Sequence, residues 1–92
     1  MRLLIVEDEK ELCDTIAKTL YQAGYEVDTC YDGDEALDYI LAENYDLIVL
    51  DLNLPGTDGM DILKELRKEN EETKVLILSA RSQIMDKVEG LD

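Results

Sequence analysis

The sequence has 92 residues and a mass of 10.5 kDa, which allows one small domain and excludes a second. Nine Lys and Arg against 23 Asp and Glu give a net charge of −14, which repels nucleic-acid phosphates and anionic lipid, so we expect no direct binding to nucleic acid or membrane. Hydrophobic residues make up 46% of the sequence and occur in periodic blocks, which excludes a disordered acidic tail.

The first quarter of the sequence predicts a buried strand followed by a helix. Leu3–Val6 is a short apolar run with β-branched residues and ends at an acidic cluster, as expected for a strand buried in a sheet. Apolar residues then recur every four positions as far as Ala23, and Gly24 provides a stop. This spacing predicts an amphipathic helix, whose apolar stripe is Leu12, Ile16 and Leu20.

A second strand and a second helix follow. Tyr25–Tyr31 alternates in polarity and ends at the turn-forming pair Asp32-Gly33, which predicts a strand. Asp34 is expected to cap the next helix, which ends near Asn44. Its helical spacing is shown by Ala36, Leu37, Ile40 and Leu41.

The remaining sequence predicts two more strand and helix pairs. Leu47–Leu50 and Val75–Leu78 are apolar without alternation, which is typical of strands buried on both faces; Asp51 closes the first and Ser79 the second. A loop over residues 52–58 separates the first of these strands from a helix. The apolar positions of this helix and of a last helical stretch are Met60, Leu63 and Leu66, then Ile84, Val88 and Leu91.

The element order is therefore βαβαβαβα within a single domain, residues 1–92. Because crossovers between parallel strands are right-handed, this order predicts an α/β fold: a doubly wound, mostly parallel sheet with helices on both faces. Ligands of such sheets bind at the carboxyl ends of the strands, where the strand order reverses. Residues that close the buried strands are therefore candidates for a functional site.

Three carboxylates are expected to meet at that edge if the first and third strands are neighbours: Glu7, Asp8 and Asp51. Like charges gathered at a partly buried site repel unless a cation shares it, and oxygen ligands select a hard cation such as Mg²⁺. We expect Asp8 and Asp51 to bind Mg²⁺ directly, the backbone carbonyl of Asn53 to be a third ligand, and Glu7 to act through water. A metal-bound carboxylate can also attack phosphorus, so Asp51 is a candidate phosphoacceptor, and the Ser79 hydroxyl could hydrogen-bond the phosphoryl group.

The two cysteines are interpreted as structural. Cys13 and Cys30 lie among apolar neighbours, and the sequence opens on a strand-like run with no signal-peptide core. These features predict a cytoplasmic protein with reduced, packed thiols, although a disulfide between the two is possible on paper.

Three segments resemble the receiver domain of bacterial two-component response regulators, the CheY-like family. They are LLIVEDE at residues 3–9, LIVLDLNLPGTDGM at residues 47–60 and VLILSAR at residues 75–81. The resemblance implies that Asp51 accepts a phosphoryl group from a histidine kinase, that Glu7 and Asp8 hold Mg²⁺, and that Ser79 is the switch hydroxyl. The middle segment looks most like the OmpR-type subfamily, whose full-length members are DNA-binding transcription regulators.

The resemblance also implies a flavodoxin-like strand order, 2-1-3-4-5, with the fifth strand and fifth helix absent from this sequence. The receiver domain would then be incomplete at its C-terminus, and the backbone edge of the fourth strand would be exposed. We expect this edge to cause self-association or exchange of segments between chains. A fragment that acts only as a structural or interaction module is the alternative function.

Other site types fit less well. The run that begins at Asp51 meets the first positions of an EF-hand calcium loop, but Pro55 and Ile62 occupy unsuitable positions. A haloacid-dehalogenase-type phosphatase needs a second acid where Asn53 stands. A flavodoxin-like FMN site needs Ser, Thr or Gly after the first strand, where acidic residues would repel the phosphate.

Overall fold

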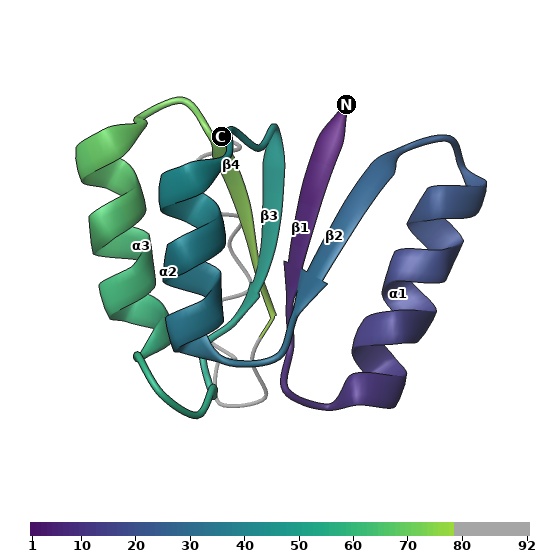
Figure 1. Cartoon of the computed structure of the whole chain (residues 1–92), viewed down its shortest axis with the longest axis horizontal. Helices are drawn as coiled ribbons and strands as arrows, with labels where there is room; N and C mark the ends of the chain where they lie inside the picture. The colour runs from purple at the N-terminus through teal and green to yellow at the C-terminus, as the bar shows by residue number, and fades with distance from the viewer. Residues whose placement is uncertain (79–92) are drawn as a thin grey trace.

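The computed structural model describes residues 1–78, and these form a four-stranded parallel sheet with helices on both faces (Figure 1). Its order, β2-β1-β3-β4, is the predicted one. Ser79 and the expected last helical stretch lie outside the described residues. The elements are β1 (Arg2–Val6), α1 (Lys10–Gln22), β2 (Glu26–Cys30), α2 (Gly33–Ala42), β3 (Leu47–Asp51), α3 (Gly59–Glu69) and β4 (Lys74–Leu78).

Helix α1 covers one face of the sheet, and α2 and α3 cover the other (Figure 1). Successive residues of the central strands therefore enter different cores: Val6 and Leu50 pack on the side of α2 and α3, whereas Ile5 and Val49 pack on the side of α1. All four are at most 4% exposed, which explains why β1 and β3 show no polar alternation. Full burial of each such side chain contributes about 1.5 to 3 kcal/mol to stability.

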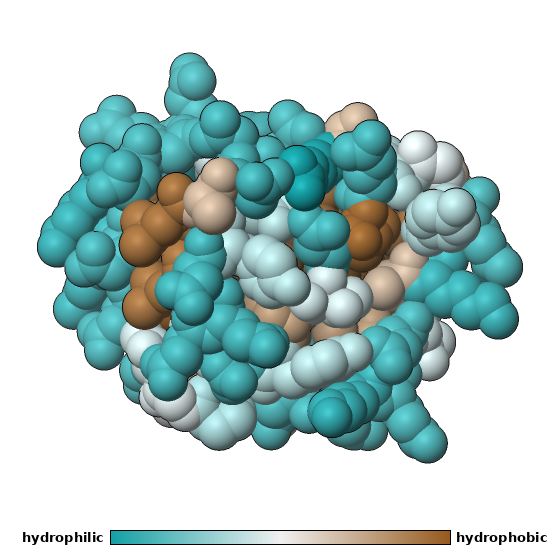
Figure 2. Space-filling view, in the orientation of Figure 1, coloured by the Kyte–Doolittle hydropathy of each residue, from teal (hydrophilic) through white to brown (hydrophobic). Residues whose placement is uncertain are grey.

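The protein surface seen in Figure 2 is mostly hydrophilic, with smaller hydrophobic patches between the helices. This distribution agrees with the net charge of −14. No helix within residues 1–78 has the length and apolar character that a membrane span requires. Both cysteines are buried and unpaired; burial raises the pKa of the Cys13 thiol to about 11 and that of Cys30 to about 12, so both are protonated at neutral pH.

The helix ends show one correct expectation and one error. Gly24 follows α1 with a φ of +102°, the left-handed conformation that ends helices, as predicted. The N-cap of α2 is Asp32, not Asp34: the Asp32 side chain accepts a hydrogen bond from the Glu35 N–H at 2.8 Å. Both aspartates can cap a helix, and the choice depends on a tertiary contact that uses Asp34 elsewhere.

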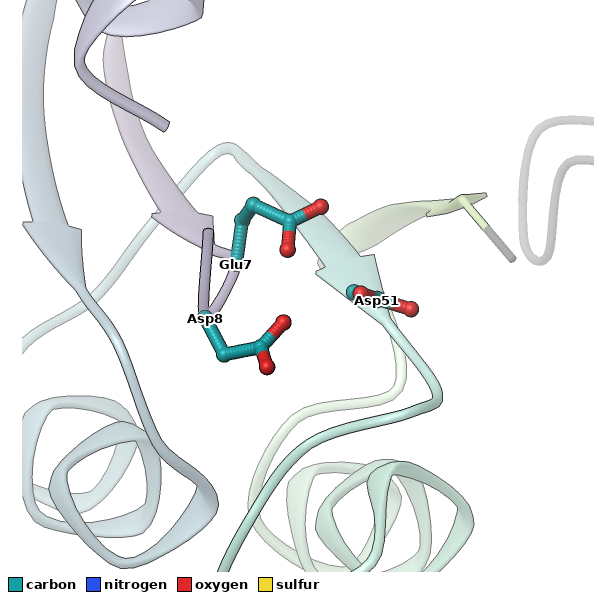
Figure 3. A group of neighbouring side chains, drawn as sticks. All are labelled: Glu7, Asp8 and Asp51. Atoms are coloured by element: carbon teal, nitrogen blue, oxygen red, sulfur yellow. The ribbon is translucent and has the colours of Figure 1, made fainter. Parts of the chain in front are cut away.

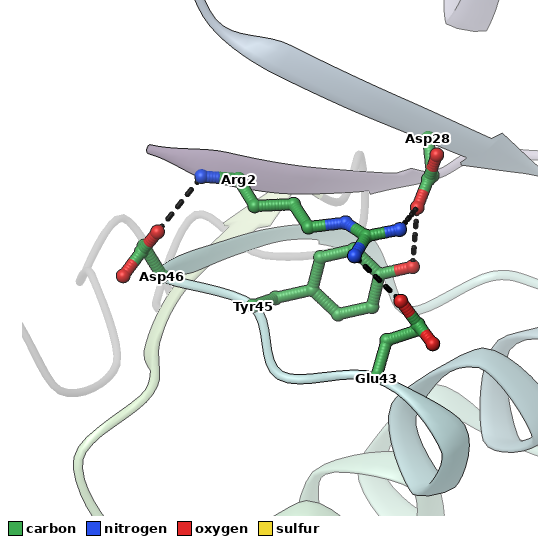
Figure 4. Close-up of polar contacts among 5 residues, drawn as sticks. All are labelled: Arg2, Asp28, Glu43, Tyr45 and Asp46. Atoms are coloured by element: carbon green, nitrogen blue, oxygen red, sulfur yellow. Dashed lines mark hydrogen bonds and ion pairs between the residues drawn. The ribbon is translucent and has the colours of Figure 1, made fainter.

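Arg2 joins neighbouring strands at the N-terminal end of β1 (Figure 4). Its guanidinium contacts Asp28 of β2 at 3.1 Å and Glu43 after α2, and lies over the ring of Tyr45. Its backbone N–H donates to Asp46 at 2.7 Å. The Tyr45 hydroxyl donates to Asp28 at 2.7 Å, and burial together with this contact raises the pKa of Tyr45. These contacts tie β1 to β2 and to the segment that enters β3.

Helix α2 approaches the loop between β3 and α3 at Gly33. The Gly33 N–H donates to the Pro55 carbonyl at 2.9 Å. A Cβ atom at Gly33 would lie 1.9 Å from the backbone oxygen of Thr57, so only glycine fits between the helix and the loop. This contact holds the loop that follows β3 against the start of α2.

We expect Gly33→Ala to lower the free energy of unfolding by about 1 to 3 kcal/mol, because the added methyl group collides with backbone that cannot rotate away. Alanine otherwise favours helices, so intrinsic propensity predicts the opposite sign. Urea denaturation followed by circular dichroism measures the change. Asp38→Ala, at an exposed position of the same helix, is the control and should change stability by less than about 0.5 kcal/mol. Equal stability of Gly33→Ala and the native protein would contradict the close approach.

Candidate metal centre

Parallel pairing of β1 with β3 brings the acidic ends of the two strands together. Val6 pairs with Leu50, so the next residues along the chain, Glu7 and Asp51, leave the same edge of the sheet. Figure 3 shows the side chains of Glu7, Asp8 and Asp51 near one another at the ends of the two strands. One carboxylate oxygen from each lies within 4.8 Å of the others. The structure thus brings together all three acids that were expected to meet.

Two of the three carboxylates are largely withdrawn from water. Glu7 is 6% exposed and Asp51 is 9% exposed, whereas Asp8 is exposed. Each of the buried acids accepts a backbone hydrogen bond from the residue two positions later: Glu9 N–H to Glu7 at 3.0 Å, and Asn53 N–H to Asp51 at 3.0 Å. These short local bonds orient the carboxylates and leave each with a second oxygen for a ligand.

The electrostatic cost of this arrangement is evident at Glu7. The pKa of Glu7 is raised to about 7, chiefly by burial; the neighbouring Asp8 and Asp51 also raise it, whereas the hydrogen bond from Glu9 lowers it. A carboxylate with such a pKa binds a proton near neutral pH when nothing else supplies positive charge. A cation at the cluster would take the place of that proton.

The residues of the cluster fit a hard divalent cation. All the side-chain donors are carboxylate oxygens, and the cysteines lie in the two cores as protonated thiols. Mg²⁺ is commonly held by one or two carboxylates and keeps several waters, which suits a cluster with one exposed and two buried acids. Asn53 lies on the loop directly after Asp51, where its backbone is held by the bond to that carboxylate.

Sequence reasoning missed the residues that fix the loop after Asp51. The Asp34 carboxylate accepts hydrogen bonds from both the hydroxyl and the backbone N–H of Thr57, at 2.6 and 3.2 Å. The available signal was the spacing from Asp32 to Glu35, which suits a cap and leaves Asp34 for another role. The expected site residue Ser79 lies outside residues 1–78, so the structure does not place it.

Comparison with known proteins supports the resemblance to response regulator receiver domains. Residues 3–92 match the response regulator receiver domain family. The chain is 49% identical over 92 residues to the transcriptional regulatory protein DltR of Streptococcus agalactiae, a match that covers 100% of this chain and 41% of DltR. The chain therefore spans less than half the length of this relative. A relative named as a transcriptional regulator agrees with the expected OmpR-type subfamily.

Two solved structures have the same fold. The response regulator TrrA of Thermotoga maritima, in complex with Mg(2+)-BeF, matches with a TM-score of 0.81 and 38% identity, over 88% of this chain and 70% of that one. A chain in the complex of the histidine kinase ThkA with TrrA matches with a TM-score of 0.81 and 36% identity, over 94% of this chain and 74% of that chain. The family match over residues 3–92 and the shared fold show that this chain belongs to the response regulator receiver domain family.

Proposed function

We propose that this protein is the signal receiver of a two-component system, in which Asp51 accepts a phosphoryl group from a histidine kinase with the help of Mg²⁺. The observation that carries the proposal is the meeting of Glu7, Asp8 and Asp51 at the ends of β1 and β3 in a member of the receiver family. Asp8 and Asp51 bind the ion directly, the Asn53 carbonyl completes the protein ligands, and Glu7 acts through water.

The chemistry assigned to Asp51 is nucleophilic attack on phosphorus. One carboxylate oxygen forms a bond to the phosphorus of a phosphohistidine as the bond from phosphorus to the imidazole nitrogen breaks; the imidazole leaves with the electron pair and takes up a proton. Asn53 N–H bonds one Asp51 oxygen and so orients the carboxylate. Bound Mg²⁺ supplies neutralisation of charge on the phosphoryl oxygens. The protein is thus a phosphoacceptor rather than an enzyme acting on many substrate molecules.

Ser79 is proposed as the switch hydroxyl that hydrogen-bonds the phosphoryl group. Support for this role comes from the resemblance of residues 75–81 to the family and from the position of Ser79 directly after β4. Strand β4 pairs with β3 in a register that sets Leu78 opposite Asp51, so β4 ends at the edge of the sheet that carries the acids.

The partner and context follow from the same assignment. The TrrA–ThkA complex supports a histidine kinase as partner, and DltR supports a transcription regulator as the parent protein. The net charge of −14 supports the assignment of DNA binding in the parent protein to another domain and not to this chain. We assign the protein to the cytoplasm, where thiols are kept reduced, in agreement with its two unpaired cysteines. A purely structural module is not favoured, because such a module has no need of a buried acidic cluster.

Asp51→Asn should abolish phosphorylation, because the amide that replaces the carboxylate is a far weaker nucleophile. Intact-mass spectrometry after incubation with Mg²⁺ and acetyl phosphate should show one added phosphoryl group on the native protein and none on the variant. Asp38→Asn, an exposed aspartate of α2, should be phosphorylated like the native protein. Equal labelling of Asp51→Asn and the native protein would rule out Asp51 as the acceptor.

The affinity for Mg²⁺ should rise with pH and level off above the Glu7 pKa of about 7. A proton on Glu7 competes with the cation, so we expect about tenfold tighter binding at about pH 8 than at about pH 6. Without Mg²⁺, the free energy of unfolding has the opposite pH dependence. The raised pKa of Glu7 favours the folded state at acid pH, and this contribution is lost as the pH rises through about 7. Isothermal titration calorimetry at several pH values measures the affinity.

Three variants test the assignment of the ligands in that experiment. Glu7→Gln should remove most of the pH dependence between about pH 6 and about pH 8, since it cannot titrate. Asp8→Asn should weaken binding at least about tenfold at every pH, whereas the matched change Glu9→Gln, one residue further along, should have little effect. An unchanged affinity in Asp8→Asn would exclude Asp8 as a direct ligand.

We also propose self-association through the edge of β4. Among the described residues β4 is the last strand of the sheet, and its apolar side chains Leu76, Ile77 and Leu78 are only half-buried. Size-exclusion chromatography with light scattering at tens of micromolar should give a mass above the 10.5 kDa of one chain. A stable, well-folded monomer over this concentration range would refute pairing through this edge.

A further inference from the structure

The loop over residues 52–58 is held at each end by its own residues. Near its start, the Asn53 N–H donates to Asp51 at 3.0 Å, and at its end the Asp58 side chain caps α3 by accepting from the Met60 N–H at 2.8 Å. Between these points lie Pro55, Gly56 and Thr57, which belong to no helix or strand. This middle part has no local side-chain bond of its own and depends on another element for its position.

Helix α2 supplies that support through two adjacent residues. The Gly33 N–H donates to the Pro55 carbonyl at 2.9 Å. One oxygen of Asp34 accepts both the Thr57 hydroxyl at 2.6 Å and the Thr57 N–H at 3.2 Å. Asp34 is a charged acceptor, and hydrogen bonds to charged acceptors are shorter and stronger than those between neutral groups. We refer to the pair Asp34 and Thr57 as the loop clamp.

The fold leaves Asp34 available for this contact. Capping of α2 is done by Asp32, whose side chain accepts the Glu35 N–H, so Asp34 has no part in starting the helix. Gly56 has a φ of +80°, a conformation that few side chains tolerate, and a Cβ at this position would lie 3.2 Å from the Asp34 carboxyl carbon. The loop therefore turns directly against Asp34, and its path and the position of the carboxylate depend on each other.

We propose that the loop clamp positions the backbone at Asn53 for Mg²⁺, so that Asp34 and Thr57 are positioning residues of the metal centre although neither touches it. This inference rests on the proposed function, in which the Asn53 carbonyl is a ligand. A flexible loop binds a ligand with an affinity reduced by the fraction of time it spends in the competent conformation. Interactions that hold the loop in that conformation before binding therefore raise the affinity without adding a ligand.

Thr57→Val and Thr57→Ser form the decisive pair. Valine keeps the shape of threonine but removes the hydroxyl, whereas serine keeps the hydroxyl, and neither changes the charge of the protein. We expect Thr57→Val to raise the Kd for Mg²⁺ about two- to tenfold, the factor that corresponds to the net contribution of one hydrogen bond. Thr57→Ser should stay close to the native value. Calorimetric titration with Mg²⁺ alone, under conditions in which every variant is folded, gives these constants.

Asp34→Ala tests the other half of the clamp. Loss of a negative charge weakens cation binding anywhere on the surface, so the matched control is Asp38→Ala, which removes the same charge from the same helix. Asp34→Ala should weaken Mg²⁺ binding more than Asp38→Ala does. Hydrogen exchange in the absence of Mg²⁺ provides an independent readout: amides of residues 53–57 should exchange faster in Thr57→Val and Asp34→Ala than in Thr57→Ser and Asp38→Ala.

The results separate the clamp from the proposed function. If Thr57→Val loses stability but binds Mg²⁺ like the native protein, the clamp is only structural and the inference is wrong. If the native protein binds Mg²⁺ but Asp51 takes up no phosphoryl group, the phosphoacceptor role fails. The Mg²⁺ affinities of the Thr57 and Asp34 variants still test the loop clamp in that case. If the native protein binds no Mg²⁺, the metal centre and the clamp both fail.

Discussion

The repulsion among three carboxylates held at one edge of the sheet is the constraint on which the rest of the structure depends. Parallel pairing of β1 with β3 forces Glu7 and Asp51 to the same edge, and burial of both removes the water that would otherwise screen their charges. The side chains of β1 and β3 favour this pairing, because a shift by one residue would move each of them into the core on the opposite face of the sheet. The packing and pairing of β1 and β3 thus keep together a group of charges that would separate in a flexible chain.

Rigid and adjustable parts of the site come from different parts of the fold. Asp51 belongs to the end of β3 and Glu7 follows β1 directly, so their backbones are set by the sheet. Asn53 lies on a loop whose later residues, Pro55 and Thr57, contact α2, an element remote in sequence. Loops carry functional groups at many sites because a scaffold can hold them without burying their backbone. Here the scaffold includes the first turn of α2 as well as the sheet.

Much of the fold could be predicted because it depends on local patterns and one rule of handedness. The apolar runs of β1 and β3 indicate burial on both faces, and right-handed crossovers then leave few possible arrangements. The strand order that makes β1 and β3 neighbours comes from the resemblance to receiver domains, and the meeting of Glu7 and Asp51 follows from that order. The contact of Asp34 with Thr57 could not be predicted, since Asp32 and Asp34 both suit a helix cap and only the distant loop decides between them. The raised pKa of Glu7 depends on burial and on two neighbours, which a sequence pattern does not measure.

The charge of the site also sets the order in which its ligands can bind. The phosphoryl donor assigned to this protein is anionic, and it must approach a molecule with a net charge of −14 at a cluster of carboxylates. A divalent cation that displaces the proton of Glu7 balances two of the three formal negative charges of Glu7, Asp8 and Asp51. With that cation in place the local field opposes the donor far less. Any residue that raises the occupancy of the cation, the role proposed here for Thr57, would therefore also control how readily the proposed acceptor Asp51 meets a phosphoryl group.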